Sequence, residues 1–93
     1  MKAGVISWRR IREVEGYGTL IVDVRDSVSY ARGHYEGAVN IPYEQLERHI
    51  SELVRYETIV FYCDFGSHSL MAAKRLSRMG VKAYSVLGGY EER

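Results

Sequence analysis

The chain contains a single cysteine, Cys63, in surroundings that suit a reactive side chain. Residues 58–62 before it are β-branched or aromatic throughout, which predicts a buried strand. Residues 70–79 after it are rich in helix formers and are followed by Gly80, which predicts a helix. Cys63 is therefore expected at the carboxyl end of a strand, where the polar loop 64–69 begins. Ligands and reactive groups gather at that edge of open α/β sheets.

The residues of this loop favour a nucleophilic thiol. Gly66 permits a tight curl of the backbone, and Ser69 is expected to be the N-cap of the following helix. A curled loop that leads into a helix N-terminus turns several N–H groups inward and stabilises an anion. The sulfur of Cys63 would then be held as the thiolate, the form that attacks. The alternative is a structural cysteine, because free cysteines are commonly buried, and the local pattern leaves both open.

Length and composition predict one small domain over residues 1–93. Hydrophobic residues make up 46% and charged residues 27% of the chain, and the net charge is +1 with the signs mixed. This balance argues against a nucleic-acid or membrane surface. One cysteine excludes an internal disulfide and a cysteine-rich zinc site. The first ten residues lack the apolar run of a signal peptide, so we expect a cytoplasmic location.

Strands and helices are expected to alternate along the chain. Beyond the Cys63 strand and its helix, we expect a short helix at 7–15, a buried strand at 19–24, one or two helical turns at 27–31 with Ser27 as the cap, a short apolar piece at 38–41, an amphipathic helix at 43–53 and a strand at 81–87. This order predicts an α/β fold with a central parallel sheet flanked by helices on both faces. Asp23, Ile41, Cys63 and Leu87 would then share one edge of the sheet, which favours an active site there.

Five separate pieces of the sequence occur in the order and spacing of a known family. They are Asp23-Val24-Arg25, Tyr30 with Gly33-His34, the run 37–42 (Gly-Ala-Val-Asn-Ile-Pro), Cys63-x-x-Gly66 leading to Ser69, and the run 86–90 (Val-Leu-Gly-Gly-Tyr). With these pieces the chain resembles a single-domain rhodanese, a sulfurtransferase module, over about residues 20–90. The resemblance implies a rhodanese-like fold.

The resemblance also implies an activity. Cys63 would accept a sulfane sulfur from thiosulfate, a persulfide or a polysulfide, become a persulfide, and pass the sulfur to a thiophilic acceptor. That acceptor would be a thiol such as glutathione or thioredoxin, or cyanide in an assay. The two nucleophilic steps need no metal or organic cofactor. The loop backbone would cradle the anionic sulfur, which gives a binding role to Asp64, Phe65, Gly66, Ser67, His68 and Ser69.

Three positions depart from the family pattern. The family's loop commonly carries Arg or Lys where this chain has His68, and a neutral imidazole supplies no charge. Asp64 places a carboxylate beside the thiolate. Both changes disfavour the thiosulfate dianion and favour a persulfide, a polysulfide or protein-bound sulfur as donor. The acidic residue usual before Tyr30 is Ser29 here, so Arg25 would need another partner, such as Asp26.

Other polar residues are expected to support the site. Asp23 and Arg25 at a strand end are most simply a structural ion pair, because buried charges persist mainly when paired. His34 is expected to brace a loop through a hydrogen bond, and the three histidines lack the spacing of metal ligands. The pair Gly88-Gly89 is expected to let the backbone pass close to the cysteine loop.

Two other functions remain open from the sequence. One is a non-catalytic or redox-sensing interaction module that uses the same loop. The other is a cysteine phosphatase or arsenate reductase, whose loop needs Cys-x5-Arg to grip an oxyanion. Counted from Cys63, the position that would need arginine is Ser69, which argues against that class.

Overall fold

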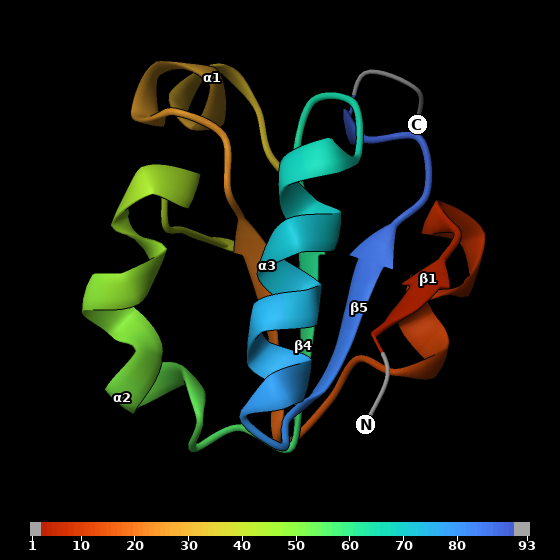
Figure 1. The fold of residues 1–93 in the computed structure, drawn as a ribbon. Coiled ribbons are helices and arrows are strands. Elements are labelled where there is room, and N and C mark those ends of the chain that lie inside the picture. Colours follow the sequence, from red (N-terminus) through yellow and green to blue (C-terminus); the bar gives the residue numbers. More distant parts are fainter. Residues whose placement is uncertain (1–2, 91–93) are drawn as a thin grey trace.

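The computed structural model describes residues 3–90 and is built around a five-stranded parallel sheet (Figure 1). Its strands are β1 (Gly4–Ile6), β2 (Thr19–Asp23), β3 (Val39–Asn40), β4 (Thr58–Tyr62) and β5 (Lys82–Val86), in the spatial order β1-β5-β4-β2-β3. Strand β4 lies in the centre, paired with β2 on one side and β5 on the other. The strand that leads to Cys63 is therefore the most enclosed one.

Helices cover both faces of the sheet, as the sequence predicts. The helical elements are η1 (Trp8–Glu13), α1 (Ser27–Arg32), η2 (Tyr43–His49), α2 (Ile50–Leu53) and α3 (Ser67–Arg78), where η denotes a 3₁₀ helix. One core cluster joins β4 to α3 through Phe61, Ala73 and Leu76, and it also contains Leu46 and Leu53 from η2 and α2. The second cluster, on the opposite face, contains Ile11 of η1 and Val60. The prediction of a parallel α/β domain with helices on both faces is confirmed.

The prediction of an amphipathic helix at 43–53 is only partly correct. Leu46 and Leu53 are buried as the pattern predicts, but the segment is a 3₁₀ helix over Tyr43–His49 followed by one α-helical turn. Its first residues are held from outside the helix, because the Tyr43 N–H donates to the carbonyl of Val24. Pro42 precedes them and provides no side-chain cap.

Two caps and one strand also differ from the sequence prediction. Gly66, not Ser69, is the N-cap of α3, and it adopts a left-handed conformation with φ 98°. Asp26, not Ser27, caps α1 by accepting a hydrogen bond from the N–H of Ser29. The edge strand β1 was not predicted; it pairs with β5 over only three residues. Within residues 3–90, no helix is long and apolar enough to cross a membrane.

Candidate active site

Cys63 directly follows β4, and its side chain is 4% exposed. After it the chain curls through Gly66, whose φ of 98° suits glycine alone, and enters α3 at Ser67. The curl aims two backbone N–H groups at the sulfur. Gly66 N lies 3.0 Å and Ser69 N 3.4 Å from Sγ. These donors stabilise negative charge on the sulfur, as an N–H-lined loop at a helix N-terminus does for other anions.

A buried pair of hydroxyls backs the sulfur. The Cys63 thiol donates to Oγ of Ser69 at 3.4 Å, and Ser69 is fully buried. The Ser69 hydroxyl donates to the Gly66 carbonyl, 3.1 Å away, and its oxygen lies 2.7 Å from Oγ of Ser85. A hydroxyl rotor between these partners can turn its proton toward a thiolate. Ser85 comes from β5, and no local motif in the sequence pointed to it.

The double glycine lets the C-terminal segment press against the cysteine loop. A Cβ at Gly89 would overlap the carbonyl of Asp64 and lie 2.7 Å from the N–H of Phe65. The next residue ties the loop down, because the N–H of Tyr90 donates to the Cys63 carbonyl at 2.7 Å. The close passage predicted for Gly88-Gly89 is therefore present.

The predicted Asp23–Arg25 ion pair is also present, and it is buried beside the cysteine. Nε of Arg25 lies 3.1 Å from both carboxylate oxygens of Asp23, and NH2 lies 2.8 Å from Oδ2. Burial opposes the guanidinium charge, but the hydrogen bonds and attraction of Asp23 outweigh it and raise the pKa of Arg25. NH2 also donates to the Gly33 carbonyl, and the guanidinium lies 4.2 Å from the ring centroid of Tyr90. Asp26, the other partner considered, is occupied in capping α1.

His68 lies at the edge of the site with its ring fixed by an aromatic partner. It stacks on Tyr43 with ring centroids 4.5 Å apart and an interplanar angle of 3°. Tyr43 is far from the loop in sequence, so sequence reasoning missed it. The stack holds the imidazole at the border between the cysteine loop and η2.

These side chains enclose a cavity of about 290 Å³ over Cys63. Its lining residues are Val24, Arg25, Asp26, Glu44, Cys63, Asp64, Phe65, Ser67 and His68. The lining carries three carboxylates, from Asp26, Glu44 and Asp64. The N–H of Ser29 donates to the Asp26 side chain and lowers its pKa, which keeps that carboxylate ionised. The one permanent cation among these lining residues, Arg25, is paired closely with Asp23, and its NH1 also lies 4.0 Å from Oδ1 of Asp64.

His34, another predicted supporting residue, does not line the cavity. Its Nδ1 lies 2.8 Å from the carbonyl of Tyr30, and its ring stacks on the Tyr30 ring with centroids 3.7 Å apart. His34 therefore makes a hydrogen bond, as expected from the sequence, and its role as a loop brace stays a prediction. Within residues 3–90, no group of three or more His, Cys, Asp or Glu side chains is arranged to hold a metal ion.

The fold and the site define an α/β domain with a cysteine-centred site. Its central strand ends at one buried cysteine, and the loop that follows directs backbone N–H groups at the sulfur. The chain belongs to the rhodanese-like domain family, whose model matches residues 10–92. The resemblance drawn from the five sequence pieces is thereby confirmed.

Two named relatives of the chain are sulfurtransferases. The chain is 42% identical over 69 residues to the tRNA sulfurtransferase of Pyrobaculum aerophilum, which covers 74% of this chain but 14% of that protein. It is 33% identical over 73 residues to the thiosulfate sulfurtransferase PspE of Escherichia coli K12, which covers 76% of this chain and 70% of the relative. The chain thus spans a small part of the first relative and most of the second.

Solved structures agree on the fold. A Staphylococcus saprophyticus protein, SSP1007, superposes with a TM-score of 0.82 at 27% identity, covering 96% of this chain and 91% of the other. The rhodanese homologue TT1651 of Thermus thermophilus superposes with a TM-score of 0.73 at 24% identity, covering 95% of this chain and 98% of the other. The second likeness concerns the fold alone.

Proposed function

We propose that this protein transfers sulfane sulfur through a persulfide on Cys63. The observation that carries the proposal is the Cys63 sulfur, which accepts hydrogen bonds from two backbone N–H groups at the base of an open cavity. The family and the named relatives support sulfurtransferase activity in general. The family and the relatives do not specify the donor, the acceptor or the role of each residue, and these are proposed here from the site.

The reaction proceeds in two displacements on sulfur. The Cys63 thiolate attacks the outer sulfur of a donor persulfide, a new S–S bond forms, and the donor's own S–S bond breaks to release its thiolate. An acceptor thiolate then attacks the outer sulfur now carried by Cys63 and regenerates the Cys63 thiolate. A thiol such as glutathione or thioredoxin fits the acceptor role, and a reducing compartment such as the cytoplasm would keep Cys63 reduced.

Each loop residue has a distinct task in this scheme. The N–H groups of Gly66 and Ser69 hold the anionic sulfur, and the Ser69 hydroxyl supports it from behind. The outer sulfur of the persulfide would lie in the cavity, where the acceptor reaches it. The carboxylates of Asp64, Asp26 and Glu44 repel a doubly charged donor. A persulfide with one negative charge or none is therefore the better donor than thiosulfate.

Intact-mass spectrometry tests the proposal. The protein is exposed in parallel to thiosulfate, glutathione persulfide and polysulfide, and then to peroxide as a separate arm. Gain of one sulfur atom, lost again on addition of a thiol, is expected with the persulfide and polysulfide. Gain of oxygen from peroxide with no gain of sulfur from any donor would instead favour the redox-sensing alternative.

The substitution His68→Arg is expected to raise thiosulfate turnover. Arginine supplies a permanent charge and two parallel donors, whereas a neutral imidazole supplies no charge. A charge-assisted hydrogen bond is worth about 1.5–3 kcal/mol, so kcat/KM for thiosulfate should rise roughly tenfold or more, chiefly through KM. The measurement is paired kinetics of both proteins with thiosulfate and with glutathione persulfide at pH 8.

The persulfide reaction serves as the control for this substitution. It should change much less, because that donor carries less charge at the reacting sulfurs. Equal thiosulfate kinetics in the two proteins would mean that the backbone alone binds the anion, and the inferred donor preference would be wrong.

A further inference from the structure

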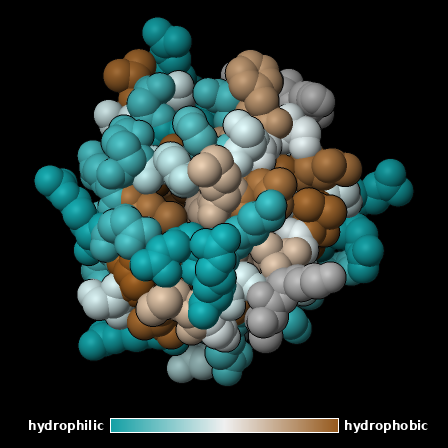
Figure 2. Space-filling view, viewed as in Figure 1, coloured by the Kyte–Doolittle hydropathy of each residue, from teal (hydrophilic) through white to brown (hydrophobic). Residues whose placement is uncertain are grey.

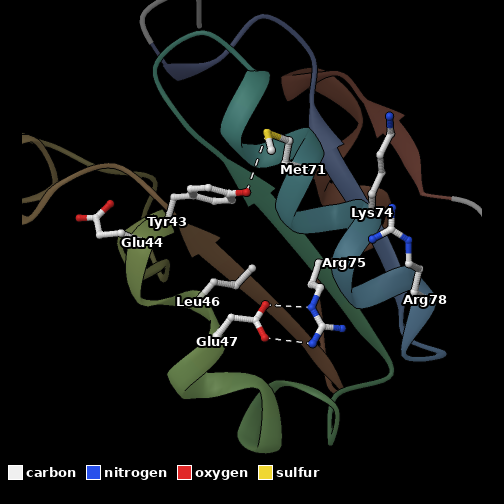
Figure 3. A pocket seen from close by; sticks show the side chains of 8 residues that line it. All are labelled: Tyr43, Glu44, Leu46, Glu47, Met71, Lys74, Arg75 and Arg78. Atoms are coloured by element: carbon white, nitrogen blue, oxygen red, sulfur yellow. Dashed lines mark hydrogen bonds and ion pairs between the residues drawn. The ribbon is translucent and has the colours of Figure 1, made fainter.

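A second hollow lies beside the Cys63 cavity, between η2 and α3. This groove has a volume of about 550 Å³ and is lined by Tyr43, Glu44, Leu46, Glu47, Met71, Lys74, Arg75 and Arg78. Figure 3 shows Tyr43 and Leu46 reaching from η2 toward α3, with Glu47 and Arg75 joined across the groove. Glu44 is among the lining residues of both the groove and the Cys63 cavity, so the two hollows are neighbours.

The floor of the groove is apolar. Leu46 is buried beneath it, and Met71 is 53% exposed along its side. The Tyr43 hydroxyl lies 3.9 Å from the sulfur of Met71, which links the two walls at the end near the cysteine. On this face apolar side chains alternate with hydrophilic ones (Figure 2). The groove therefore offers contact area for a peptide segment that carries both apolar and polar side chains.

The charges of the groove are unevenly placed. Arg75 and Glu47 neutralise each other through two hydrogen bonds of 2.8 and 3.0 Å. Lys74 and Arg78 are one helical turn apart on α3, and neither makes an ion pair or side-chain hydrogen bond within the described part of the chain. Glu44 lies at the opposite end, where it also lines the cavity over Cys63. The far end is thus positive, whereas the end at the cysteine is negative.

We infer that the groove binds an extended, acidic segment of the protein that exchanges sulfur with Cys63. The inference rests on the proposed function and names the partner's chemistry. Along α3, Lys74 and Arg78 lie six and ten residues beyond His68, or about 9 and 15 Å at the rise of a helix. An extended chain covers about 3.3 Å per residue. The acidic side chains of the segment should therefore lie about three to five residues from its sulfur-bearing residue.

The test uses two synthetic peptide persulfides that differ only in charge. Both carry one cysteine persulfide. One has Asp at the third to fifth positions from the cysteine, and the other has Lys there. The quantity measured is kcat/KM for sulfur transfer through Cys63, divided by the value for glutathione persulfide. The acidic peptide is expected to exceed the basic one by about fivefold or more at low ionic strength. The difference should shrink with added salt, since exposed charges are screened beyond about 8 Å at physiological ionic strength.

Charge reversal locates the effect. The double variant K74E/R78E should invert the peptide preference. The control is Arg12→Glu, a single charge reversal at an exposed arginine of η1 on the opposite face of the sheet, which should leave the preference as in the wild type. Equal rates for both peptides, or a preference for the basic one, would overturn the inference, provided that glutathione persulfide still loads Cys63. Failure of every persulfide to load Cys63 would instead overturn the proposed function.

Discussion

Replacing Cys63 with serine is expected to abolish sulfur transfer while the fold remains. The protein has no other thiol, and the two N–H groups of the loop would surround a hydroxyl that cannot form a persulfide. The change is nearly isosteric, so the packing against α3 should persist. The measurements are turnover with glutathione persulfide and the intact mass after exposure to the donor.

Unfolding in urea provides the control for this variant. A midpoint close to that of the wild type would show that loss of activity is chemical rather than structural. Turnover by the serine variant near the wild-type rate would contradict the persulfide mechanism.

The substitution Asp23→Asn is expected to cause the largest loss of stability. It removes the close negative partner of a guanidinium whose side chain is 3% exposed and leaves only the Asp64 carboxylate, 4.0 Å away, to balance the buried charge. Breaking one side of a buried ion pair costs about 3–5 kcal/mol, a large share of the stability of a small domain. The measurement is the free energy of unfolding from urea titration.

A matched control exists in the exposed pair of Arg10 and Glu13, whose side chains are 67% and 60% exposed. The substitution Glu13→Gln removes the same kind of contact in water, where such pairs contribute little. It should leave the unfolding midpoint unchanged within error. Equal effects of the two substitutions would show that burial of the Asp23 pair does not determine its contribution.

The sequence predicted best what depends on continuous patterns. The run at 58–62 forms β4 within those bounds, and Cys63 follows it directly. The strand at 81–87 forms over Lys82–Val86, and the glycines that follow approach the loop as expected. A buried central strand is apolar along its whole length, and this signal needs no knowledge of its neighbours.

The sequence could not predict features that depend on distant contacts. Ser69 was expected to cap α3, but it is buried against Ser85, sixteen residues away. The stack of His68 on Tyr43 also joins segments whose proximity follows from the folded sheet. Strand β1 is short and exists because β5 offers it an edge. Local propensity carries no information on such partners.

The position of Trp8 gives this protein an internal optical probe. It is the sole tryptophan, and its Nε1 donates to the carbonyl of Gly89 at 2.9 Å. Gly89 in turn abuts Asp64, the residue after the cysteine. A displacement of the cysteine loop would pass through this contact to the indole and change its fluorescence. We therefore expect loading of Cys63 with sulfur, and its discharge, to change the fluorescence of Trp8, which can be followed in real time without a label or an added cysteine.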